Sequence, residues 1–201
     1  LRIQAAFERA SRPSSRRRRA LTPGGNIEGP HIAVSPQAFR RRVEKLFARA
    51  TRESDPLACL RVAIDPVVAE PDAEPPTRAE LEQTLRNQLQ TLRSVIRSSV
   101  RGADRYNPDG EHGYLIVLSD THFPGALTVA ERIVRQLRRH LRAQAAPLFT
   151  VSIGVSFYPN RETRKVEDLL GLVDAALDRA RAEGGGRICL YQHQGYLYAP
   201  E

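Results

Sequence analysis

The chain has 201 residues, of which 41% are hydrophobic, enough for one domain of ordinary size with an extension. No segment approaches 18 consecutive apolar residues, which argues against a transmembrane helix, and residues 1–19 lack the apolar stretch of a secretory signal. The net charge of +8 is uneven: residues 1–20 hold seven arginines and one glutamate, whereas the other 181 residues hold 24 basic and 22 acidic residues. A nearly neutral body predicts no nucleic-acid partner.

The first third of the chain predicts a basic segment, a loop, a helix and a strand. We interpret residues 1–19 as a basic linker or signalling helix, with a short helix over 1–10. Glycine and proline predict a loop over 21–36, and a helix over 37–52 buries one face formed by Phe39, Val43, Leu46 and Phe47. The apolar run 57–64 predicts a buried strand. It contains Cys59, and we expect this cysteine and Cys189 to be buried, reduced thiols.

The remaining elements alternate between helices and strands. Thr77 and Glu80 form a capping box at the start of a long helix that reaches about residue 100. The sequence then predicts strands over 105–107, 113–119, 149–158 and 187–192. It predicts helices over 124–141 and 166–181. This order predicts an α/β or α+β fold, a central mixed sheet of about five strands flanked by helices. We place the domain at 20–192 and a tail at 193–201.

Several separated segments together resemble one known family. They are Leu21-Thr22 followed by Asn26, Ser119-Asp120-Thr121, Ala130-Glu131-Arg132-Ile133, the strand Val151–Val155, and the run from Ala176 to Arg187. At matching spacing they resemble the GGDEF family, the diguanylate cyclase domain that joins two GTP molecules into cyclic di-GMP. The resemblance covers residues 20–192 and implies a nucleotidyl-cyclase-like sheet.

The family's catalytic signature is degenerate in this chain. The signature Gly-Gly-Asp-Glu-Phe is replaced by Gly110, Glu111, His112, Gly113 and Tyr114. The resemblance implies carboxylates for divalent metal at the end of the first strand and in this turn. Mg²⁺ prefers hard oxygen ligands, whereas neutral imidazole suits other metals. We therefore expect no bound metal or other cofactor and no diguanylate cyclase activity.

Further positions implied by the resemblance are also altered. The metal-ligand aspartate of the first strand is Ala63, and the asparagine that reads guanine is Pro71. Glu80 matches the second base-reading position only in part. Asp65 and Asp72 remain, and we interpret both as solvated loop acids.

An Arg-x-x-Asp pair precedes the degenerate turn. Arg101 and Asp104 stand at the position of the family's inhibitory product site, five residues before the signature. A guanidinium presents a planar fork to phosphate or to the guanine O6/N7 edge, and a carboxylate accepts from guanine N–H groups. The resemblance implies a further contact from Arg132. A second Arg-x-x-Asp, Arg52 to Asp55, has no family position behind it and serves as an internal control.

These observations lead to one functional hypothesis and two alternatives. The first is a catalytically inactive GGDEF-type receptor that binds cyclic di-GMP through Arg101, Asp104 and Arg132, as an intercalated dimer, and relays its level to a partner protein or neighbouring domain in bacterial signalling. The resemblance also allows a homodimer, and we expect a cytoplasmic location. The second is a nucleotide-independent interaction or dimerisation module. The third is a regulator that binds GTP without turnover.

Overall fold

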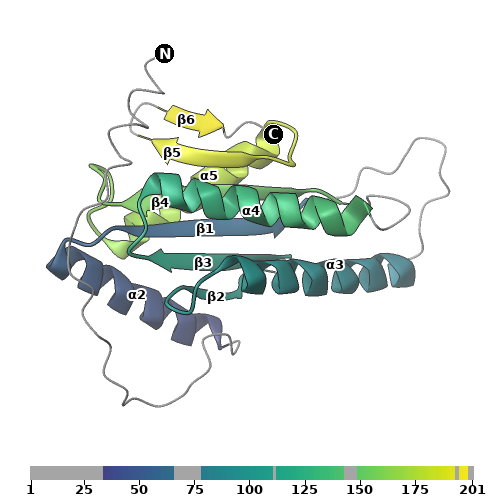
Figure 1. The fold of residues 1–201 in the computed structure, drawn as a ribbon, viewed down its shortest axis with the longest axis horizontal. Helices are drawn as coiled ribbons and strands as arrows, with labels where there is room; N and C mark the ends of the chain where they lie inside the picture. The colour runs from purple at the N-terminus through teal and green to yellow at the C-terminus, as the bar shows by residue number, and fades with distance from the viewer. Residues whose placement is uncertain (1–33, 66–77, 111, 143–148, 193–194, 199–201) are drawn as a thin grey trace.

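The computed structural model describes residues 34–65, 78–110, 112–142, 149–192 and 195–198. These form one six-stranded sheet with the strand order β2-β3-β1-β4-β5-β6 and two layers of helices (Figure 1). The strands are β1 Leu57–Ile64, β2 Arg105–Pro108, β3 Gly113–Ser119, β4 Val151–Tyr158, β5 Ile188–Gln192 and β6 Gly195–Tyr198. The helices are α2 Pro36–Glu53, α3 Arg78–Ser99, α4 Phe123–Arg142 and α5 Val166–Ala182. The expected α/β class and its mixed sheet are confirmed.

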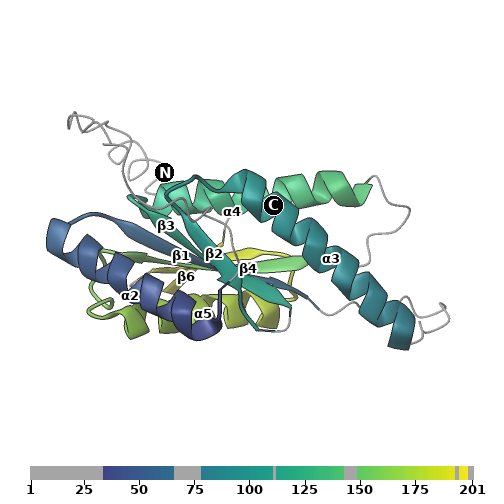
Figure 2. The same ribbon diagram turned by 90° about the horizontal axis from the view of Figure 1, so that it is seen from below.

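The central strand β1 organises the sheet. It pairs antiparallel with β3 on one side and with β4 on the other, and β4 pairs parallel with β5. Helices α3 and α4 cover one face of the sheet, and α2 and α5 cover the other (Figure 2). Each face therefore has its own apolar layer, a large one under α3 and α4 and a smaller one under α2 and α5.

Alternation along β1 explains why both faces can be buried. Leu60 and Val62 belong to the layer under α3 and α4, whereas Leu57 and Cys59 belong to the layer under α2. Successive side chains of a strand point to opposite faces, so an almost continuous apolar run fills both layers. Cys59 and Cys189 are buried and form no disulfide, as the sequence predicts, and burial raises the pKa of the Cys59 thiol to about 12.

One expectation at the C-terminal end is wrong. Residues 195–198, assigned to a tail, form the edge strand β6, which pairs antiparallel with β5 in the register Leu190 to Leu197. A four-residue strand is too short to show a periodic pattern, so its pairing partner decides its structure. The helix expected over 1–10, the capping Thr77 and the acidic Asp72 lie outside the described residues. Among the described helices, none is long and apolar enough to cross a membrane.

Candidate functional site

The Arg-x-x-Asp segment forms a closed turn between α3 and β2. The backbone N–H of Asp104 donates to the carbonyl of Arg101 at 3.0 Å, and the backbone N–H of Arg101 donates to Asp104 Oδ2 at 2.7 Å. Asp104 is only 2% exposed, and this burial raises its pKa, although the Arg101 N–H and the nearby arginines oppose the shift. Arg101 itself is exposed. The turn thus holds a buried carboxylate close to an exposed guanidinium.

Two further guanidinium groups lie at this turn. Arg105 donates from Nη1 to the carbonyls of Gly102 and Asp104, both at 2.8 Å. Arg132 of α4 donates to the carbonyl of Ser99, the last residue of α3. A cation at a helix C-terminus is favoured because the last carbonyls carry partial negative charge. The structure therefore brings Arg132, 31 positions along the chain, beside the turn that holds Arg101.

Asp104 Oδ1 has an unusual environment. It is buried and has no hydrogen bond of ordinary geometry among the described residues, although the backbone N–H of Ser119 faces the carboxylate and lowers its pKa. Leaving one carboxylate oxygen unsatisfied in a buried turn is costly, because the group loses its water without gaining a donor. The geometry assigns Asp104 a turn-holding role through Oδ2, and the backbone N–H groups of Arg101 and Ser119 both face its carboxylate.

The segment Gly110–Tyr114 spans the tight connection between β2 and β3 and the start of β3. Gly110 adopts φ +66°, and the backbone N–H of Asp109 donates to the carbonyl of Gly113 at 3.0 Å. A Cβ atom on Gly113 would lie 2.5 Å from the carbonyl oxygen of Val62, so only glycine fits there. Tyr114 turns inward, is buried, and packs edge-on against another tyrosine with ring centroids 6.2 Å apart.

The two positions implied for metal carboxylates are neighbours in the structure. Ala63 pairs with Gly113 across β1 and β3, and the N–H of Ile64 donates to the carbonyl of His112 at 2.9 Å. Ala63 offers a methyl group and His112 an exposed imidazole, and Glu111 lies outside the described residues. Among the residues that the structure covers, no group of three or more His, Cys, Asp or Glu could hold a metal ion. The described residues at this edge therefore do not fit the divalent cation of the family.

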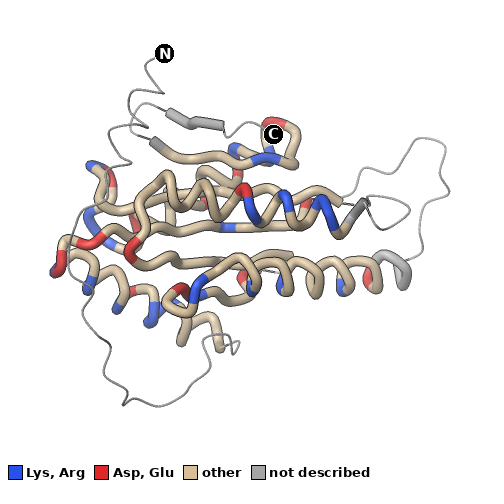
Figure 3. The backbone as a smooth tube through the Cα atoms, viewed as in Figure 1, with Lys and Arg blue, Asp and Glu red and all other residues tan. Residues whose placement is uncertain are grey.

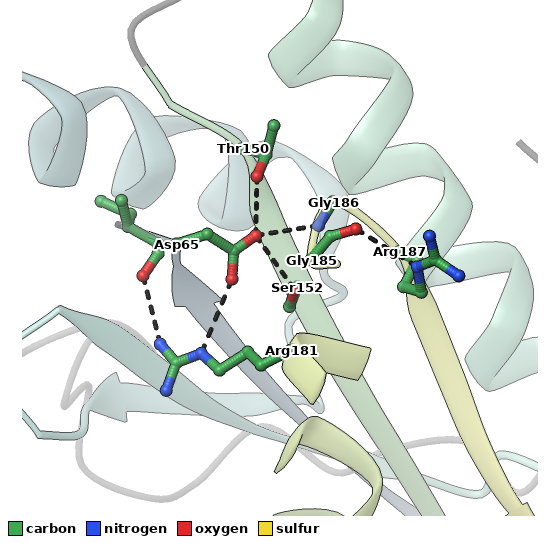
Figure 4. Close-up of polar contacts among 8 residues, drawn as sticks. Asp65, Thr150, Ser152, Arg181, Gly185, Gly186 and Arg187 are labelled. Atoms are coloured by element: carbon green, nitrogen blue, oxygen red, sulfur yellow. Dashed lines mark hydrogen bonds and ion pairs between the residues drawn. The ribbon is translucent and has the colours of Figure 1, made fainter. Parts of the chain in front are cut away.

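Asp65, expected to be a solvated loop acid, is instead buried and held by several polar partners (Figure 4). Its Oδ2 accepts from the Thr150 hydroxyl at 2.8 Å, the Ser152 hydroxyl at 3.0 Å and the Gly186 N–H at 2.9 Å. Arg181 lies 3.6 Å from Oδ1 and also donates to the carbonyl of Ile64 at 3.1 Å. The expectation fails because the partners come from the start of β4, the C-terminal end of α5 and the loop after it, which only the fold brings to the end of β1.

The glycines after α5 do more than end the helix. Gly184, Gly185 and Gly186 all have positive φ, and a Cβ on Gly185 would meet Asp65 Oδ2 at 3.0 Å. Three left-handed glycines in succession turn the backbone so that an N–H points at the Asp65 carboxylate. A single glycine is enough to end a helix. The run of three glycines was therefore the sequence signal for this contact.

A second ion-pair network was also missed from the sequence. Arg61, in the middle of β1, forms ion pairs with Asp109 of the signature hairpin and with Asp174 of α5, the latter at 2.6 Å. Burial raises the pKa of Asp174, which the Arg61 guanidinium opposes. The network fastens the hairpin and the helix to one strand. A charged residue inside an apolar strand was the signal that pointed to it.

The control motif is not organised in the same way. Arg52 is exposed and lies 3.1 Å from the carboxylate of its neighbour Glu53, and Asp55 follows the end of α2. The two Arg-x-x-Asp segments therefore differ in structure, because only the one at 101–104 closes on its own backbone.

Comparisons with known proteins match part of the sequence of this chain and its fold. A family model described as "Diguanylate cyclase, GGDEF domain" matches residues 82–187. Diguanylate cyclase A of Treponema denticola is 28% identical over 104 residues, which are 51% of this chain and 28% of that protein. The chain thus matches little more than a quarter of that relative's length.

Solved structures show the same fold. The active GGEEF domain of a diguanylate cyclase from Vibrio cholerae superposes with a TM-score of 0.64 at 23% identity, over 78% of this chain and 96% of that one. The GGDEF domain of DgcB from Caulobacter crescentus, solved in complex with c-di-GMP, superposes with a TM-score of 0.62 at 14% identity, over 85% and 98%.

Proposed function

This chain belongs to the diguanylate cyclase GGDEF family, and from that premise we propose that it binds cyclic di-GMP at the turn 101–104 without synthesising it. One observation carries the proposal. The exposed Arg101, the half-buried Arg132 and the buried Asp104 gather at one turn, whereas the nearby positions Ala63 and His112 carry no carboxylate. The chain has kept the groups suited to binding an anionic dinucleotide and lost those suited to phosphoryl transfer.

The chemistry of the turn suits a guanine dinucleotide. An intercalated dimer of cyclic di-GMP presents several phosphates and stacked bases, which guanidinium groups can neutralise and cover. Arg101 is exposed and ready for this role, and Arg132 stands beside it at the end of α3. Asp104 Oδ1, which has no hydrogen bond of ordinary geometry among the described residues, is suited to accept from guanine N1–H and N2–H once the turn adjusts around the ligand. Binding would then be relayed to a partner protein or neighbouring domain.

Calorimetric titration with cyclic di-GMP tests the binding site. Loss of a charge-assisted hydrogen bond costs about 1.5–3 kcal/mol, or roughly 10- to 150-fold in affinity, so Arg101→Ala and Arg132→Ala should each weaken binding by that factor. Arg52→Ala is the matched control, an exposed arginine in the same motif, and should leave affinity unchanged. Cyclic di-AMP should bind far more weakly.

The role of Asp104 needs its own comparison, because the residue also holds the turn. Asp104→Asn keeps an acceptor for the Arg101 N–H, whereas Asp104→Ala removes it. If Asp104 reads guanine, both variants should lose affinity; if it only holds the turn, the asparagine variant should bind like the wild type. Wild-type protein that binds no cyclic di-GMP at tens of micromolar would favour a nucleotide-independent interaction module.

The absence of synthesis is tested separately. Purified protein is incubated with GTP and either Mg²⁺ or Mn²⁺, and the products are separated by chromatography. We expect no cyclic di-GMP above a blank. Turnover that disappears in His112→Ala would show that the altered turn is still catalytic and would refute this part of the proposal.

A further inference from the structure

The outer face of α3 and α4 is strongly basic. The two helices lie side by side on one side of the sheet, and arginines are spread along both of them (Figure 3). Residues 82–99 of α3 and 123–140 of α4 hold seven arginines and two acidic residues, a net charge of +5. Six of these arginines are exposed and make up what we call the arginine face: Arg86, Arg93, Arg97, Arg135, Arg138 and Arg139.

The charge of the arginine face is not neutralised locally. None of its six guanidinium groups forms an ion pair with a carboxylate in the part of the chain that the structure describes. On the opposite side of the sheet the pattern is reversed: Arg40 pairs with Glu44 and with Glu167 of α5, and Arg49 pairs with Glu53. Paired surface charges cancel each other's field, whereas clustered unpaired ones attract an anionic partner.

The other exposed residues of this face narrow the class of partner. Every exposed residue of α3 from 82 to 99 and of α4 from 123 to 140 is polar or charged, with no aliphatic side chain and no Phe, Tyr or Trp. Specific protein interfaces are anchored by buried aromatic and apolar side chains, and single-stranded nucleic acid is bound by aromatic stacking. A duplex groove admits a single helix, whereas this face presents two. A broad surface on which the exposed arginines outnumber the exposed acidic residues by six to two fits an anionic bilayer.

We propose that the arginine face adsorbs this domain onto an anionic lipid surface. The binding is electrostatic and peripheral, because the face has no apolar side chain to insert among the acyl chains. The inference goes beyond the proposed receptor function and does not depend on it, since it uses neither Arg101 nor Arg132. It places the α2 and α5 side of the domain away from the bilayer (Figure 2).

Vesicle co-sedimentation of the whole 201-residue chain tests the proposal. The probes are vesicles with about 30% phosphatidylglycerol in phosphatidylcholine and vesicles of phosphatidylcholine alone. We expect binding to the anionic vesicles at about 50 mM salt, strong weakening at about 300 mM, and none to the neutral vesicles. Absence of binding to the anionic vesicles at low salt would overturn the proposal.

Charge-matched variants locate the binding surface. An arginine near an anionic bilayer strengthens binding about fivefold, so replacing Arg86, Arg93 and Arg97 together by glutamine should weaken binding about 100-fold. The triple replacement of Arg135, Arg138 and Arg139 should act similarly. The control replaces three exposed cations of α2, namely Arg41, Lys45 and Arg52, and should change binding less than about threefold.

Two results would contradict the assignment. If all three triple variants bind equally, the charge of residues 1–20 or the net charge carries the adsorption, and the face does not. If a duplex DNA binds with the expected dependence on the arginine face while anionic vesicles do not bind, the partner is nucleic acid and the lipid proposal is wrong. Cyclic di-GMP titration of the same variants should remain at wild-type affinity, which separates this test from that of the receptor function.

Discussion

Replacing Asp65 by alanine tests whether this residue is the buried, hydrogen-bonded carboxylate of the structure or the solvated loop acid expected from the sequence. A solvated loop acid can be replaced with a change in the free energy of unfolding within about 0.5 kcal/mol. In the structure, Asp65 is 6% exposed, accepts three hydrogen bonds and faces Arg181. The variant would leave the Ser152 hydroxyl buried without this acceptor and Arg181 without its carboxylate.

The magnitude follows from these contacts. Hydrogen bonds to a charged group contribute about 1.5–3 kcal/mol each, and breaking a buried ion pair costs about 3–5 kcal/mol. These terms are not additive, and the side chain of Arg181 is 39% exposed, so it regains some hydration. We therefore expect Asp65→Ala to lower the free energy of unfolding by about 3 kcal/mol, near the lower end of the range for one member of a buried pair.

Urea unfolding followed by circular dichroism measures the change in the free energy of unfolding. The dependence of this free energy on urea concentration is taken as equal for both proteins only if both unfolding curves are two-state. Asp178→Ala, an exposed aspartate on α5, is the matched control and should change stability by less than about 0.5 kcal/mol. A loss of less than about 1 kcal/mol for Asp65→Ala would refute the reasoning, because a buried carboxylate with these partners cannot be removed so cheaply.

Three further changes have defined outcomes. Gly113→Ala should destabilise the domain by about 2 kcal/mol or more, since its Cβ would lie 2.5 Å from the Val62 carbonyl; a thermal melt at the wild-type midpoint would contradict this. Burial raises the pKa of Asp104, so the folded state binds more protons than the unfolded state, and the Asp104 contribution to stability should fall as pH rises from about 4. Between about pH 4 and pH 7, the urea midpoint of Asp104→Asn should therefore decline less steeply than that of the wild type. Cys59 and Cys189 should resist a thiol reagent in the folded protein and react on unfolding, because both are buried; rapid labelling under native conditions would count against the core packing.

The sequence by itself determined the elements and the likeness to the family. Helices α2, α4 and α5 begin and end within a residue or two of their expected positions, because their apolar residues repeat with the helical period. Strand β1 was recognisable as a continuous apolar run, and its burial on both faces follows from alternation along the strand. The positions of Arg101, Asp104 and His112 depended on local spacing, so these too could be named in advance.

Contacts between distant segments were decided only by the tertiary structure. Asp65 meets Thr150 and Gly186, which lie 85 and 121 positions later in the chain, and no local pattern encodes that meeting. Strand β6 exists because β5 offers it an edge, and the arginine face exists because α3 and α4 pack side by side. A chain whose body is nearly neutral by count thus carries a basic surface, because net charge is a sum over residues whereas an electrostatic field depends on where the fold places them.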